Sequence, residues 1–217
     1  MLQAKPGAIG GRGLSSGYRV LCYPARHVSK IDPPRQPLTD YYAVFTGLID
    51  SVSIPRFTQA LLNLSDPERN MGRLHILIQS NGGIVGDGVF LYNLFKNYPL
   101  PLTLYNGGTI ASIAVIAFLG AKERKASARA TFMIHRTKFT PQSAFAAGLK
   151  SFANAAPIED ARTESILREH VALPPDKWTA LNANTDVLIA AEESVEYGFA
   201  TEIGEFSPPP GTQLYTI

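Results

Sequence analysis

The sequence predicts an α/β fold with parallel strands. A short apolar run at 74–78 is typical of a strand buried on both faces of a sheet, and a glycine turn and a helical stretch at 85–96 follow it. The same order of strand, glycines and helix recurs over 100–119, and another strand is expected at 131–134. Such alternation favours parallel pairing through right-handed crossovers.

The length of 217 residues, of which 45% are hydrophobic, is enough for one substantial core. We expect one domain over 41–206. Residues 1–40 contain five prolines and many glycines, so an irregular N-terminal arm is predicted there. Three consecutive prolines at 208–210 predict a loose C-terminal tail over 207–217.

The remaining elements follow from local patterns. A strand is expected at 42–46, and Pro55 lies in the first turn of a helix that presents Phe57 and Leu61 at helical spacing. After residue 135 the pattern becomes helical as far as about 181. A short helix then ends at Gly198, and a last strand is expected near 199–203.

Composition excludes several classes of function. The 20 basic and 18 acidic residues are too balanced for a nucleic-acid surface. The single cysteine, Cys22, cannot form an intrachain disulfide and indicates a reducing, cytoplasmic location. No apolar run reaches the roughly 20 residues that a membrane span needs. The histidines lack the spacing of metal ligands, so no metal is expected, and His27, His75 and His170 are assigned structural roles.

The stretch 106–112, Asn-Gly-Gly-Thr-Ile-Ala-Ser, stands before a wholly apolar helix at 113–119. Its two glycines predict a turn, and Ser112 is then the first residue of the helix. A serine at this place is ordinarily an N-cap.

Other polar groups are predicted at the same edge of the sheet. Gly82, Gly83, Ser112 and His135 each follow a predicted strand, and sites form beyond the carboxyl ends of parallel strands. Acyl transfer needs a nucleophile, a base and N–H donors for the oxyanion. The N–H of Ile113 is a further donor beside Ser112.

A carboxylate that orients the histidine completes such a set. Asp186 is the candidate because it precedes the apolar run 187–189, whereas Asp87 lies within a predicted helix. The alternatives remain open at this point. They are an N-cap serine, a strand-end histidine bonded to backbone, and an aspartate that caps a turn.

Four motifs resemble a known family. They are Ile-Gln-Ser-Asn-Gly-Gly-Ile-Val at 78–85, Gly-Thr-Ile-Ala-Ser-Ile at 108–113, Phe-Met-Ile-His at 132–135, and Asp186 followed by Ser-Val-Glu-Tyr-Gly at 194–198. In this order and spacing, over about 42–203, they resemble the Clp protease proteolytic subunit, ClpP. The chain departs from that family at Arg136 and Thr137, where Gln-Pro is typical, and at Thr185, where an arginine is common.

The resemblance implies a ClpP/crotonase-like fold of repeated β-β-α units, with a protruding helical handle at about 140–181. It implies a serine endopeptidase that works through an acyl-enzyme. Ser112 is then the nucleophile, His135 the general base and Asp186 its orienting carboxylate.

The same resemblance implies the groups that hold the substrate. Gly82 or Gly83, together with Ile113, would supply the oxyanion N–H groups. Ile84 and Val85 would pair with an extended peptide.

The resemblance also implies partners. The chain would assemble with itself into a heptameric ring or a double ring, and its substrates would be peptides or unfolded proteins. An AAA+ unfoldase is the expected partner. The peptidase itself needs no cofactor, and ATP would act only through the unfoldase.

Two other functions remain possible from the sequence. A ClpP-like subunit without catalytic activity could mix with an active paralogue, although such subunits typically lose a member of the triad. A crotonase-type enzyme that acts on acyl-CoA would share the glycine-based oxyanion hole, but Ser112 and His135 are unexpected in it.

Overall fold

The computed structural model describes residues 38–139 and 145–217. The predicted N-terminal arm up to residue 37 lies outside the described residues, as do residues 140–144 of the predicted handle. The first described strand begins at Thr39, two residues before the predicted start of the domain.

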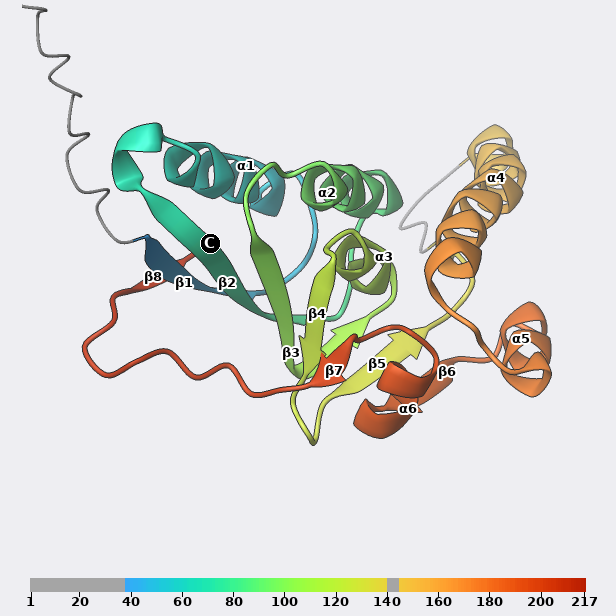
Figure 1. Ribbon diagram of the computed structural model, residues 1–217. Coiled ribbons are helices and arrows are strands. Elements are labelled where there is room, and N and C mark those ends of the chain that lie inside the picture. Colours follow the sequence, from blue (N-terminus) through green and yellow to red (C-terminus); the bar gives the residue numbers. More distant parts are fainter. Residues whose placement is uncertain (1–37, 140–144) are drawn as a thin grey trace, which may run out of the picture. The chain divides into compact units, whose positions relative to one another are not determined.

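One mixed sheet forms the centre of the domain (Figure 1). In spatial order its main path is β6 (Val187–Ala190), β5 (Thr131–Ile134), β3 (Leu102–Ala111), β2 (Met71–Ser80), β1 (Thr39–Thr46) and β8 (Leu214–Thr216). Two further strands lie off this path, β4 (Glu123–Ala126) beside β3 and β7 (Glu202–Ile203) beside β4. Among these pairs only that of β5 and β6, in the described residues, is antiparallel. The predicted α/β class is confirmed.

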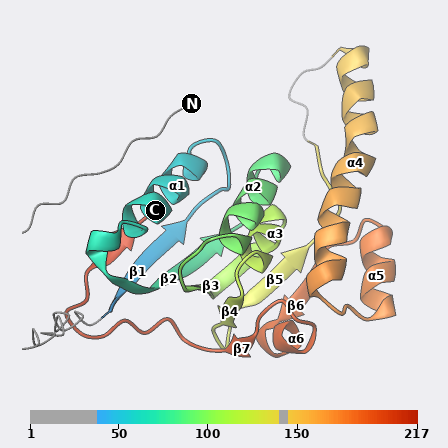
Figure 2. The same cartoon turned by 45° about the horizontal axis from the view of Figure 1, so that its top comes forward.

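Three helices cover one face of this sheet (Figures 1 and 2). They are α1 (Ser53–Leu64), α2 (Val85–Lys96) and α3 (Ile113–Leu119), and a short 3₁₀ turn, η1 (Pro67–Arg69), follows α1. Every residue of α3 is buried, and Phe118 packs on Phe132 of β5 with ring centroids 5.4 Å apart. The apolar core therefore surrounds the helix that begins at Ser112.

The second half of the domain carries the helix that fits a handle. The long helix α4 (Ala146–His170) projects beside the sheet (Figure 2), and α5 (Pro175–Asn182) and α6 (Ala191–Glu196) follow it. Only Ile166 and Leu167, near the end of α4, are buried among its residues. Phe145, directly before it, is 93% exposed. Within the part of the chain that is described, no helix has the length and apolarity to cross a membrane.

The predicted turn at the paired glycines before Ser112 is wrong. Strand β3 continues through Gly107 and Gly108 to Ala111, and neither glycine has a positive φ. The strand changes partners here, because it pairs with β4 as far as Asn106 and with β5 from Thr109. A Cβ atom on Gly107 would lie 2.5 Å from the side chain of Leu77. Close packing, and not a turn, explains this glycine.

Asn106 holds the point where β3 changes partners. Its side chain is fully buried, donates a hydrogen bond of 2.8 Å to the carbonyl of Thr131, and accepts one of 3.1 Å from the N–H of Gly108. Both backbone groups belong to strands that lead to Ser112 or His135. Asn106 therefore contributes to the position of both residues.

The predicted loose tail is wrong at its end. Leu214–Thr216 pairs with β1, and the N–H of Ile217 donates to the carbonyl of Val44 over 3.0 Å. The side chain of Ile217 is buried. The prolines at 208–210 do prevent regular structure, but they end before the last residues, which then satisfy the edge of β1.

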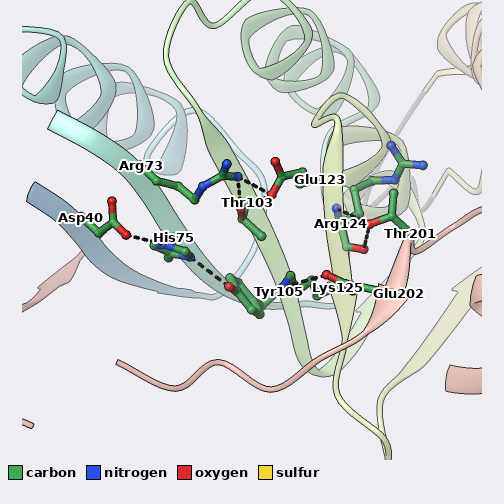
Figure 3. A network of polar contacts seen from close by, with 10 residues as sticks. All are labelled: Asp40, Arg73, His75, Thr103, Tyr105, Glu123, Arg124, Lys125, Thr201 and Glu202. Atoms are coloured by element: carbon green, nitrogen blue, oxygen red, sulfur yellow. Dashed lines mark hydrogen bonds and ion pairs between the residues drawn. The ribbon is translucent and has the colours of Figure 1, made fainter. Parts of the chain in front are cut away.

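Alternation along β2, β3 and β4 places a polar row on the sheet face opposite to the core side chains (Figure 3). Arg73 of β2 donates to Thr103 of β3 over 2.9 Å and pairs with Glu123 of β4, so one side chain links three strands. His75 is hydrogen-bonded to the hydroxyl of Tyr105 over 2.9 Å. The row links neighbouring strands in the register that the backbone defines.

The buried Asn106 can be tested by substitution. Asn106→Ala should lower the free energy of unfolding by about 1–3 kcal/mol, because it removes two hydrogen bonds to partly buried backbone groups and leaves a cavity where a buried side chain was. Urea denaturation measures this change. The exposed Asn93→Ala is the control and should have little effect. Equal stabilities of the two variants would contradict the role given to Asn106.

Candidate active site

Ser112 lies at a sharp turn between β3 and α3. Its φ of 57° and ψ of −131° are unusual for a residue with a side chain, and its N–H donates to the carbonyl of Met133 over 2.7 Å. Its side chain makes no capping hydrogen bond to α3. The backbone strain is thus not explained by an N-cap, and strain of this kind is characteristic of functional turns.

The loop after β2 lies against this serine. Gly82 has a φ of 102°, and a Cβ atom placed on it would lie 2.7 Å from Cβ and 3.1 Å from Oγ of Ser112. Gly83 has a φ of 155°, and a Cβ atom there would lie 2.0 Å from the carbonyl oxygen of Ile49. Any larger residue at either position would displace the loop. The two glycines therefore let backbone approach the hydroxyl.

The N–H groups near Ser112 differ in their partners. The N–H of Gly82 donates to Oγ of Ser80 over 3.2 Å. The bridge between Ile49 and the loop uses the carbonyl of Gly82 and the N–H of Ile84, so the N–H of Gly83 takes no part in it. Ile113 is the first residue of α3, where an N–H has no partner within the helix. Gly83 and Ile113 are the better-placed donors for an oxyanion.

The residues predicted to pair with a peptide are partly occupied. Ile84 donates its N–H to the carbonyl of Ile49 over 2.8 Å, and its own carbonyl accepts from Gly88 within α2. Its side chain is 54% exposed. Val85 begins α2 and contributes to the wall of the cavity beside Ser112. Contact through side chains is therefore available here, whereas strand pairing through Ile84 would disrupt the existing bridge.

Ser112 and His135 line one small cavity of about 70 Å³. Gly83 and Ile113 line it as well, so a hydroxyl, an imidazole and the candidate oxyanion donors share one space. Leu167 of α4 closes another side. The base of the long helix thus forms part of the candidate site.

The ring of His135 has a defined tautomer. Its Nδ1 lies 2.5 Å from the carbonyl oxygen of Arg136, and a carbonyl can only accept. Nδ1 therefore carries the proton, and Nε2 of the neutral ring keeps its lone pair. This is the form in which a histidine can take a proton from a serine.

Asp186 is bonded to a lysine and not to His135. Nζ of Lys138 lies 2.7 Å from Oδ1 of Asp186, and this bond is the main cause that lowers the pKa of the carboxyl below its ordinary value. Ile134 of β5 pairs with Val187 of antiparallel β6, so His135 and Asp186, the next residues outward on the two strands, lie opposite each other. Both side chains of the ion pair are about half exposed, at 57% and 48%, and water weakens such a pair.

Lys138 was not among the residues that the sequence singled out. It lies three positions after His135 and lines the same cavity. The only signal was the departure at Arg136 and Thr137 from the family pattern. A lysine so close to a candidate base could have been noted there.

The Clp protease family model matches residues 34–207, which is more than half of the chain. The chain belongs to the Clp protease family. Among solved structures, that of a point mutant of ClpP1 from Listeria monocytogenes resembles it with a TM-score of 0.62 and 19% sequence identity. The match covers 77% of this chain and 91% of that chain. No curated protein matches. The fold is that of ClpP, and family and fold together support a ClpP-type peptidase.

Other polar groups of this ClpP-like domain have structural contacts. His170 is hydrogen-bonded through Nε2 to the hydroxyl of Tyr92 over 2.9 Å, and burial lowers its pKa. His27 lies outside the described residues. Within residues 38–139 and 145–217, no group of three or more His, Cys, Asp or Glu side chains could hold a metal ion.

A larger cavity of about 570 Å³ lies between α1 and the C-terminal strand. Arg56 and Asn63 contribute polar groups to it, and Tyr215 and Ile217 contribute apolar surface. Among the described residues that line it there is neither a serine nor a histidine. Although this cavity is larger than the one beside Ser112, its lining gives no reason to place the active site there.

The close approach of Gly82 to Ser112 predicts the effect of one methyl group. Gly82→Ala should reduce labelling of Ser112 by a fluorophosphonate by about a hundredfold, because a Cβ atom would displace the loop or the hydroxyl. The rate of labelling is followed by mass spectrometry. Gly86→Ala is the matched control, because a Cβ atom there meets nothing within 4 Å. Normal labelling of Gly82→Ala would contradict the geometry.

Proposed function

We propose that this protein is a serine endopeptidase of the ClpP type, with Ser112 as nucleophile, His135 as general base and Asp186 as the orienting carboxylate. One observation carries the proposal. Ser112 lies in a strained turn where its hydroxyl does not cap the helix, and it shares a small cavity with an imidazole whose Nδ1 faces a backbone carbonyl. An ordinary cap serine would have neither feature.

The proposed reaction begins when Oγ of Ser112 attacks the carbonyl carbon of a peptide bond. Nε2 of His135 takes the hydroxyl proton and later gives it to the leaving amine. The N–H groups of Gly83 and Ile113 would stabilise the oxyanion. Water then attacks the acyl-enzyme, with His135 again as base, and releases the second product.

Asp186 enters this scheme only after a change of partner. While it is bonded to Lys138, the Nδ1–H of His135 donates to a neutral carbonyl. A carboxylate stabilises the imidazolium better than a neutral carbonyl does, because its bond to the cation is charge-assisted. The arrangement described is therefore a resting state in the proposed mechanism.

Assembly and substrate supply complete the proposal. The chain would form a heptameric ring, and the exposed Phe145 and Leu149 at the start of α4 would contact a second ring. Peptides or unfolded proteins would be the substrates, delivered by an AAA+ unfoldase in the cytoplasm. The peptidase would need neither metal nor cofactor, and ATP would act only through that partner.

A subunit without catalytic activity is the second candidate function. The observation that favours it is the bond between Asp186 and Lys138, which withholds the carboxylate from His135. Such a subunit would enter a mixed ring and would not react with an active-site probe. Labelling of Ser112 in the purified protein would exclude it.

Removal of the nucleophile tests the proposal. Ser112→Ala should lower kcat/KM for peptide cleavage by about three orders of magnitude or more, and His135→Ala should do the same, because the two groups act together. Cleavage of a fluorogenic peptide and fluorophosphonate labelling measure the losses. The exposed Ser165→Ala is the control and should retain activity. Unchanged cleavage by Ser112→Ala would refute the proposal.

A further inference from the structure

The cavity beside Ser112 has an uneven distribution of charge. Lys138 is the one formally charged side chain among the described residues that line it. Apart from Ser112, His135 and two threonines, the rest of the wall is apolar or glycine backbone. A cation at the rim of such a cavity favours a ligand with a negative charge.

The ammonium of Lys138 is not held firmly. Its side chain is 57% exposed, and Asp186 is its partner in the one ion pair that the structure gives it. A lysine is a flexible point charge with three hydrogen-bond donors. It can therefore exchange one carboxylate for another, or bind two, without movement of the backbone.

The partner exchange has a direct consequence for His135. At present the Nδ1–H of His135 donates to the carbonyl of Arg136, and Asp186, which lies opposite His135, is bonded to Lys138. A carboxylate from a substrate that binds Lys138 would leave Asp186 free to accept from Nδ1–H. The charge that positions the substrate would thus also complete the triad.

We propose that Lys138 determines specificity for an acidic side chain in the peptide, at the residue before the cleaved bond, and that binding of this side chain releases Asp186 to His135. This inference rests on the proposed peptidase function and names its substrate class. Lys138 here acts on the substrate and, through Asp186, positions His135.

The size of the cavity narrows the substrate further. Its volume of about 70 Å³ makes it a small cavity. An aspartate side chain fits such a space better than an aromatic ring does. We therefore expect aspartate to be preferred, followed by glutamate.

The test uses full-length protein and fluorogenic peptides that differ only at the residue before the coumarin amide. Both ends are blocked, so the side chain is the only carboxylate. The wild-type protein should cleave the Asp peptide with kcat/KM about tenfold or more above the Asn peptide. Lys138→Met should remove this preference, and Lys138→Arg should retain most of it. An internally quenched peptide without Asp, which is cleaved at an internal bond and has a free carboxyl end, tests the other source of a carboxylate.

A second readout separates positioning from simple charge attraction. An uncharged fluorophosphonate should label Ser112 several-fold faster in Lys138→Met than in the wild-type protein, because Asp186 is then free to orient His135. Lys138→Arg should label at about the wild-type rate. A merely structural lysine would give slower labelling, or none, in the Met variant.

The outcomes distinguish this inference from the proposed function. The protein could label and cleave, but at equal rates for the Asp and Asn peptides, or with a preference that survives Lys138→Met. Either result would overturn the role of Lys138 and leave the proposed peptidase function intact. A preference for the free carboxyl end over the internal aspartate would overturn it as well. Protein that neither labels nor cleaves would refute both.

Discussion

The close approach of the Gly82–Gly83 loop to Ser112 is the constraint on which the candidate site depends. It requires β2 and β3 to end at the same rim, a loop without Cβ atoms, and a serine held at positive φ. Each requirement is met by backbone. The buried helix α3 anchors one side of this contact, and the bridge from Ile49 anchors the other. The nucleophile and the oxyanion donors thus belong to the rigid part of the domain.

Much of this rigid part could be predicted from the sequence, because it depends on short-range patterns. The apolar run of β2 and the limits of α2 follow from local periodicity, and so does the position of Ser112 at the start of α3. The course of β3 could not be predicted in this way. Gly107 suggests a turn when it is read alone, but its cause is Leu77 on the neighbouring strand, which only the folded sheet brings near. The pairing of β8 with β1 depends in the same way on an edge that is distant in sequence.

The candidate site likewise has a part that the sequence predicts and a part that it does not predict. Ser112, Gly83 and His135 could be brought together by the rule that parallel strands end at one rim, and the cavity contains all three. Asp186 could be chosen as a nearby carboxylate, but its partner could not be foreseen. That partner is chosen by competition between exposed side chains, and sequence spacing carries little information about such a competition. Lys138 was therefore missed although it is only three residues from His135.

The rigid backbone around Ser112 and the exposed side chains around His135 differ in how easily they can be regulated. A change in the rigid part requires hydrogen-bonded backbone to move, because a Cβ atom at Gly83 would already meet the carbonyl of Ile49. Changing the exposed part means only that one charged side chain exchanges partners in water, where the pair of Lys138 and Asp186 is weak. Control of activity by a bound substrate is therefore expected to act on His135, Lys138 and Asp186, while the geometry around Ser112 stays constant. The turn at Ser112 can therefore be fully formed while Asp186 is still bonded to Lys138. A well-formed nucleophile does not imply that the triad is aligned.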